Sequence, residues 1–168
     1  ATPMSVMVGV GKGAQNGVLI KNAEALEKFG EVDSLIIDKT GTITEGKPTV
    51  ETVGTFNTNF SESEVLQYIV SLNHNSEHPL AEATVTYAKE QNAQIIQSNN
   101  FNSVTGKGVE ATINDKNVAL GNLKMMEYAK ADIDAKMQEE AKTFQKQGKT
   151  VSYIAVDKTV VGYVVIGD

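Results

Sequence analysis

One stretch, Leu35–Thr44, has the residue types of a phosphoryl-transfer site. An apolar run starting at Leu35 leads directly into Asp38, and the chain then turns through small and hydroxyl-bearing residues. This order predicts a β-strand whose carboxyl end presents a carboxylate, and ligands bind at that end of an open α/β sheet. Asp38 suits a nucleophile, Lys39 suits anionic phosphate oxygens, and Thr40 to Thr42 supply hydroxyls and amides. We therefore interpret Asp38, Lys39 and Thr40 as catalytic.

The pair Asp38-Lys39 alone would indicate an ordinary turn, because Asp, Gly and Thr are common turn residues. The full string Asp-Lys-Thr-Gly-Thr-Ile-Thr resembles the phosphorylation motif of the P-type ATPases, a branch of the haloacid dehalogenase superfamily. The resemblance implies an aspartyl phosphate on Asp38, with Mg²⁺ held by Asp38, Thr40 and residues of later segments. Related phosphatases place a second Asp, the general acid and base, where this chain has Thr40. That difference predicts a long-lived aspartyl phosphate.

The composition of the chain excludes several classes of partner and site. The net charge of -6 and the pI near 5.0 argue against nucleic acid as a partner, because such partners select basic surfaces. With 168 residues, 40% of them apolar, the chain can form one domain with a real core, or one domain plus parts of another. The absence of Cys excludes disulfides and thiolate metal sites. No run approaches the roughly 20 apolar residues that a membrane-spanning helix needs.

The first 27 residues contain Gly9, Gly11 and Gly13, but this spacing does not fit a dinucleotide-binding loop. The passage resembles the cytoplasmic end of a membrane helix, with its connector, in heavy-metal-transporting P-type ATPases. In that family a metal-binding Cys-Pro-Cys lies just upstream of an Ala-Thr-Pro like the one at 1–3, so this chain is expected to begin after it. The stretches 1–3 and 17–21 resemble the copper-transporting branch.

The second informative stretch is Ser76-Glu77-His78-Pro79-Leu80. Pro79 suits the first turn of a helix, and on local physics alone Glu77 complements the positive helix end while His78 is a solvated cap. The stretch also resembles the nucleotide-binding signature of the heavy-metal ATPases. That resemblance implies that Glu77 and His78 contact adenine, and a carboxylate and an imidazole can both bond to its ring system.

Glycines at strand ends give the remaining candidates. Gly106 and Gly108 interrupt one pair of predicted strands, and Gly121-Asn122 ends another. As isolated features they indicate bulges or tight turns. In the heavy-metal ATPases a Gly-x-Gly and a later Gly-Asn let the backbone approach ribose and phosphates. The resemblance therefore implies five nucleotide-site residues here: Gly106, Gly108, Val109, Gly121 and Asn122.

Periodicity predicts an α/β (α+β) fold, with an antiparallel sheet of about six strands flanked by helices. A capping box at Ser61–Glu64 predicts a helix ending near Asn73, and Asp132 is predicted to cap a later helix that Gly148 ends. The predicted strands cover residues 49–56, 94–97, 101–104, 108–114, 118–120, 151–156 and 160–166.

The resemblance, together with the Gly/Pro punctuation at 45–48, implies four segments. Residues 1–27 would be a membrane-exit stub and connector, and 28–46 the first strand and phosphorylation loop of an incomplete haloacid-dehalogenase-like phosphorylation domain. Residues 47–166 would be the nucleotide-binding domain, and 167–168 would return toward the phosphorylation domain. Because one strand cannot pair alone, we expect the first 46 residues to be an orphaned, less ordered remnant.

The resemblance implies ATP and Mg²⁺ as cofactors, and export of a heavy-metal ion, copper(I), at the cytoplasmic face of a prokaryotic plasma membrane. Its implied partners are the membrane helices, the actuator domain and the rest of the phosphorylation domain, with a metallochaperone for the full protein. The isolated fragment is expected to be soluble and to bind ATP without turnover. One alternative is a soluble haloacid-dehalogenase-type phosphatase with residues 47–166 as its cap domain. A non-enzymatic scaffold is another, and failure to bind nucleotide would favour it.

Overall fold

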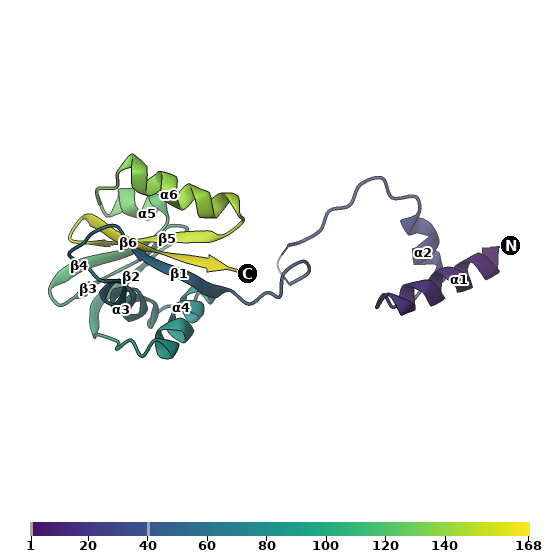
Figure 1. The fold of residues 1–168 in the computed structure, drawn as a ribbon, viewed down its shortest axis with the longest axis horizontal. Helices are drawn as coiled ribbons and strands as arrows, with labels where there is room; N and C mark the ends of the chain where they lie inside the picture. The colour runs from purple at the N-terminus through teal and green to yellow at the C-terminus, as the bar shows by residue number, and fades with distance from the viewer. Residues whose placement is uncertain (1, 40) are drawn as a thin grey trace. The chain divides into compact units, whose positions relative to one another are not determined.

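The computed structural model describes residues 2–39 and 41–168. These residues form two compact units that divide between positions 39 and 40 (Figure 1). Two residues named above, Ala1 of the amino-terminal motif and the predicted catalytic Thr40, lie outside the described residues. Each unit is described by itself.

The first unit contains two helices, α1 (Thr2–Gln15) and α2 (Ala23–Phe29). Asn22 caps α2, because its side-chain oxygen accepts a hydrogen bond of 2.8 Å from the backbone N–H of Glu24. An ion pair of 2.9 Å between Lys28 and Glu24 adds one i,i+4 contact on the exposed face. In the described part of the chain, no helix has both the length and the apolar character needed to cross a bilayer.

The strand predicted at the end of this unit does not form. The segment around Leu35–Asp38 is irregular, Ile36 is 98% exposed, and Asp38 is exposed. A strand of a doubly wound sheet needs a partner on each edge and cover on both faces. The described residues supply neither to this segment, so its apolar run has nothing to pair with.

The second unit is built on a six-stranded antiparallel sheet in the order β1-β6-β5-β4-β3-β2. This confirms the predicted fold class. The strands are β1 (Thr49–Thr55), β2 (Ser98–Val104), β3 (Gly108–Ile113), β4 (Lys116–Gly121), β5 (Thr150–Val156) and β6 (Thr159–Gly167). The strand predicted at 94–97 is wrong: the backbone N–H of Ile96 donates to the Ser71 hydroxyl, at 2.9 Å, instead of to a neighbouring strand.

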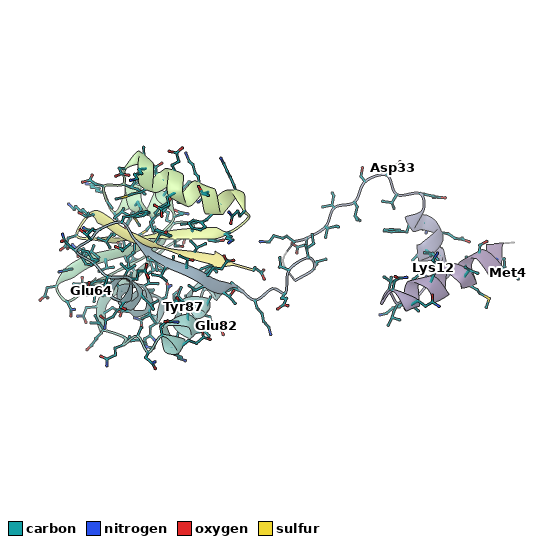
Figure 2. The ribbon with its side chains drawn as sticks, viewed as in Figure 1. Met4, Lys12, Asp33, Glu64, Glu82 and Tyr87 are labelled. Atoms are coloured by element: carbon teal, nitrogen blue, oxygen red, sulfur yellow. The ribbon has the colours of Figure 1, made fainter. Side chains whose placement is uncertain are left out.

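Helices cover both faces of the sheet (Figure 1). On one face lie α3 (Glu62–Asn73) and α4 (Pro79–Glu90), and on the other lie α5 (Leu123–Tyr128) and α6 (Ala135–Lys146). The predicted capping box is present at the start of α3, where Figure 2 labels Glu64: Ser61 and Glu64 each accept a hydrogen bond from the other's backbone N–H, at 3.2 and 2.9 Å.

The later helices differ from the prediction in two ways. The residue that caps α6 is Asp134, whose carboxylate accepts from the backbone N–H of Met137 at 2.8 Å, whereas Asp132 bridges to Thr159 through its backbone. The short helix α5 was not predicted, because Asn122 was interpreted as the end of a strand and as a nucleotide-site residue. Its side chain in fact caps that helix.

The two ends of the second unit lie together. Thr49 at the start of β1 is opposite Gly167 at the end of β6. The carboxylate of Asp168 accepts hydrogen bonds from the Thr44 hydroxyl at 2.7 Å and from the backbone N–H of Lys47 at 3.1 Å. The first and last strands of this unit therefore lie side by side at their outer ends, and the Asp168 side chain bonds to the segment that precedes β1.

Tyr163 on β6 anchors α6 to the sheet. Its hydroxyl donates a 2.9 Å hydrogen bond to Glu140, and its ring lies 4.9 Å from that of Phe56 and 6.0 Å from that of Phe144. Gly54 on β1 leaves space for the ring, since a Cβ there would lie 2.4 Å from it. Burial, with the Glu140 carboxylate acting second, raises the pKa of Tyr163 to about 12.

This pKa makes stability depend on alkaline pH. In the unfolded chain the phenol ionises near pH 10, whereas in the folded chain it stays protonated to about 12. The stabilisation is therefore complete below pH 10 and is lost as pH rises from 10 through 12. We expect Tyr163→Phe to flatten the fall in the free energy of unfolding over this interval, measured by urea denaturation. Burial also raises the pKa of Tyr153, but both proteins contain it, so the difference isolates Tyr163. Equal slopes for the two proteins would contradict the assignment.

Candidate nucleotide-binding site

A cavity of about 530 Å³ lies on the face of the sheet that carries α3 and α4. It is formed where α3 ends, α4 begins, and the β2–β3 turn meets the ends of β4, β5 and β6. Its volume falls within the range of small-molecule sites. Six of the seven predicted nucleotide-site residues line it, and they come from three separate stretches: His78, Gly106, Gly108, Val109, Gly121 and Asn122.

The lining combines an apolar floor with a polar rim. Leucine, isoleucine and valine side chains of β3 to β6 and α4 form the floor, including Val109, Leu120 and Ile166. Hydroxyl groups such as those of Ser103 and Thr150 lie among the rim residues. This combination suits a ligand with a flat apolar part and several hydrogen-bonding groups.

His78 stands at the mouth of α4 as its N-cap. Its Nδ1 accepts a 3.2 Å hydrogen bond from the backbone N–H of Leu80, and its own backbone N–H donates to the Ser76 hydroxyl at 3.3 Å. Because Nδ1 is an acceptor here, the proton of the neutral ring lies on Nε2. The imidazole therefore presents a hydrogen-bond donor, and the cap bond fixes its orientation.

Glu77 is exposed and is not among the residues that line the cavity. Its predicted contact with adenine stays a prediction. Asn73, at the end of α3, does line the cavity, is 8% exposed, and donates a 2.8 Å hydrogen bond to the buried hydroxyl of Thr84. The sequence held a signal for Asn73: it lies four residues after the buried Ile69, so it is a polar residue on the buried face of a helix.

The Gly106–Gly108 turn is held by close backbone packing. Gly108 has φ +159°, and a Cβ there would lie 2.1 Å from the carbonyl oxygen of Leu120. A Cβ on Gly121 would in turn lie 2.8 Å from the Cα of Gly108. Gly106 has φ +70° but faces open space. Gly108 and Gly121 are therefore required by sterics, and Gly106 by its backbone angle.

Asn122 ties this turn to α5. Its side-chain N–H donates a 2.9 Å hydrogen bond to the carbonyl of Gly106, while its side-chain oxygen accepts from the backbone N–H of Met125 at 3.1 Å. Its backbone N–H donates to the carbonyl of Lys107 at 3.0 Å. The geometry thus gives Asn122 a supporting role in shaping the cavity, in addition to the predicted ligand contact.

The predicted catalytic residues belong to a different part of the chain. Asp38 and Lys39 are exposed in the irregular segment that also carries Asp33, which Figure 2 labels. The described residues include no cluster of three or more His, Cys, Asp or Glu side chains that could hold a metal ion. One exposed carboxylate does not make a Mg²⁺ site. The residues that the structure describes therefore do not fit a complete Mg²⁺ site.

Comparison with known proteins places this geometry in a family. A family model described as haloacid dehalogenase-like hydrolase matches residues 32–168. The chain belongs to this family.

Its relatives within the family are heavy-metal P-type ATPases, which confirms the resemblance found in the motifs. A copper-exporting P-type ATPase of Legionella pneumophila is 45% identical over the whole chain, which spans 22% of that protein. The crystal structure of a zinc-transporting PIB-type ATPase in an E2.Pi state matches 99% of the chain and 26% of its own length, with a TM-score of 0.71 and 30% identity. The chain spans only about a fifth of the length of the curated relatives it matches.

An isolated domain of another relative also matches most of this chain. The crystal structure of the N-domain of HMA6, a copper-transporting P-type ATPase, matches 72% of this chain and 99% of its own length, with a TM-score of 0.61 and 27% identity. These comparisons give no support to the phosphatase with a cap domain.

The glycine geometry predicts unequal effects of alanine at two positions. Gly108→Ala places a Cβ against backbone atoms that cannot move aside, so we expect a loss of about 3 kcal/mol or more in unfolding free energy. Gly106→Ala meets open space and should cost only the left-handed backbone strain, about 1 to 2 kcal/mol. Urea denaturation of the two variants measures the difference. Equal losses would show that the close approach at Gly108 does not constrain the fold.

Proposed function

We propose that this chain is the ATP-binding part of a heavy-metal-transporting P-type ATPase, and that the cavity between α3, α4 and the sheet holds the nucleotide. The observation that carries the proposal is the assembly of six predicted nucleotide-site residues, from three separate stretches of sequence, around one cavity. A chance distribution of these residues over the surface would not produce such a grouping.

The groups that line the cavity match the parts of an adenine nucleotide. The apolar floor suits the faces of the base, and Nε2–H of His78 is a donor for a ring nitrogen. The tight Gly106–Gly108 turn allows backbone to approach ribose and phosphates, because no side chain stands in the way. Asn73 adds a buried amide that is already bonded to Thr84.

In the parent transporter, Asp38 is the proposed acceptor of the γ-phosphoryl group. One carboxylate oxygen attacks the γ-phosphorus, the bond from that phosphorus to the β,γ-bridging oxygen breaks, and ADP leaves. Asp38 and Lys39 lie in a unit separate from the cavity, so the isolated chain is expected to bind ATP without turnover.

We infer the activity of the whole protein from that of its relatives. We propose ATP-driven export of a heavy-metal ion, copper(I), from the cytoplasmic face of a membrane, with the membrane helices, the actuator domain and the rest of the phosphorylation domain as partners. A metallochaperone for the full protein and Mg²⁺ bound with ATP belong to the same proposal. The printed names of the relatives include both copper and zinc transporters, so the choice of copper follows the Legionella relative and the motifs at residues 1–3 and 17–21.

An amide-resolved NMR titration of the isolated chain tests the proposed site. With ATP and AMP we expect shifts at Asn73, His78, Gly106, Gly108 and Asn122, and with GTP we expect weak shifts, because a site that reads the base distinguishes the amino group of adenine from the carbonyl of guanine. Shifts confined to residues 38–42, or no shifts with any nucleotide, would overturn the proposal and favour the scaffold alternative.

The variant His78→Asn separates the ligand role of this residue from its cap role. Asn is among the preferred N-cap residues, so α4 keeps its cap while the imidazole is lost. We expect the affinity for ATP to fall about tenfold, the loss of one hydrogen bond and its packing, with little change in melting temperature. Calorimetric titration and thermal denaturation measure the two quantities. Unchanged affinity would remove His78 from the site.

A further inference from the structure

Lys107, in the middle of the Gly106–Gly108 turn, is the starting observation. Among the described residues that line the cavity, none is Asp or Glu, and Lys107 is the one with a permanent positive charge. The chain as a whole carries a net charge of -6. A cavity that is lined by a lysine and by no carboxylate, in an otherwise acidic protein, favours an anionic ligand.

The backbone of Lys107 is fixed while its side chain can move. Its N–H donates to the carbonyl of Val104 and its carbonyl accepts from the N–H of Asn122, both at 3.0 Å. The Nζ atom lies 4.7 Å from the centre of the Tyr128 ring, a cation–π contact with an exposed partner. A lysine chain has several rotatable bonds, so Nζ can leave this ring without any change in the turn.

We propose that Lys107 binds the phosphate groups of the nucleotide and that Tyr128 holds its ammonium group beside the cavity when no nucleotide is bound. This inference rests on the function proposed above and adds the residue that recognises the anionic part of the ligand. When the nucleotide binds, the Lys107 ammonium group leaves its weak contact with the uncharged Tyr128 ring. It then donates a charge-assisted hydrogen bond to a phosphate oxygen.

His78 contributes a different kind of group to the cavity. Its Nδ1 atom accepts from the backbone N–H of Leu80, so the ring offers the cavity its Nε2–H as a donor. The rim hydroxyls are uncharged. Discrimination between nucleoside and nucleotide therefore depends on Lys107, whereas recognition of the base does not.

The chain provides a matched control. Lys116, at the start of β4, also lies over an aromatic ring, with Nζ 6.0 Å from the centre of the Phe60 ring, but it does not line the cavity. Lys107→Gln and Lys116→Gln make the same change in net charge and remove a similar contact. A general electrostatic effect on the affinity for an anionic ligand appears in both variants. The loss of a direct contact with the ligand appears only in Lys107→Gln.

The experiment is calorimetric titration of wild type, Lys107→Gln, Lys107→Arg and Lys116→Gln with adenosine, AMP and ATP. For wild type we expect affinity to rise from adenosine through AMP to ATP, and to fall with added salt for the two nucleotides but not for adenosine. In Lys107→Gln we expect the affinity for ATP to fall about tenfold, which corresponds to the loss of one charge-assisted hydrogen bond. Its affinity for adenosine should not change. Lys107→Arg should retain most of the affinity, and Lys116→Gln should behave as wild type.

The outcomes separate this inference from the proposed function. If wild type binds neither adenosine nor ATP, the nucleotide site itself is refuted. If wild type binds both and Lys107→Gln weakens them equally, or weakens neither, then Lys107 does not recognise phosphate while the nucleotide site stands. An equal loss of ATP affinity in Lys116→Gln would assign the effect to net charge and would also overturn the inference.

A second measurement follows the side chain directly. While Nζ lies over Tyr128, the ring current shifts the ε-CH₂ protons of Lys107 upfield, and Tyr128→Leu abolishes that shift. We expect ATP to move these protons to the position seen in Tyr128→Leu, and adenosine to leave them in place. An ε-CH₂ resonance that ATP does not move would contradict the movement of Lys107 from ring to phosphate.

Discussion

The close approach of Gly108 and Gly121 is the constraint on which the cavity depends. At this point β3 begins and β4 ends, and the two backbones come so near that neither position has room for a Cβ. The approach brings the carbonyl of Lys107 within reach of the N–H of Asn122, and the Asn122 side chain then bonds to Gly106. One steric condition thereby fixes the turn, the end of β4 and the start of α5. A larger residue at either glycine would separate all three.

The opposite wall of the cavity depends on a polar contact. Asn73 ends α3 and Thr84 lies within α4, and their side chains bond to each other in the interior. A buried amide left without a partner costs about 1 to 3 kcal/mol, so this pair favours one relative position of the two helices. His78 lies between them in the sequence, at the first cap of α4. The Asn73–Thr84 contact thus holds the start of α4 beside the end of α3, and the cap bond of His78 orients its ring there.

How far the sequence determined these features depends on the range of the interactions involved. The α3 capping box and the closing hairpin of β5 and β6 involve residues close in sequence, and both were predicted correctly. The missed helix α5 and the cap at Asp134 depend on which of several Asn and Asp residues the fold places at a helix start, and local propensity does not decide that. The irregular segment at 94–97 differs for the same reason: Ser71, more than twenty positions earlier, supplies its hydrogen-bond partner. For the site, motifs named six of the lining residues, but the buried pair of Asn73 and Thr84 and the cation–π contact of Lys107 require the tertiary structure.

The second unit forms a complete core, whereas the Asp38 segment does not. Its first and last strands pair with each other, Asp168 bonds to Thr44 and Lys47 beside them, and the ion pair of 2.5 Å between Lys149 and Glu51 links the start of β5 to β1. Every strand of this unit therefore finds its partners between residues 49 and 167. The apolar run before Asp38 finds none within the described residues, and its side chains stay exposed. The proposed nucleotide binding and the proposed phosphoryl acceptance thus make different demands on the chain: the first needs only contacts that the second unit contains, and the second needs a sheet around Asp38.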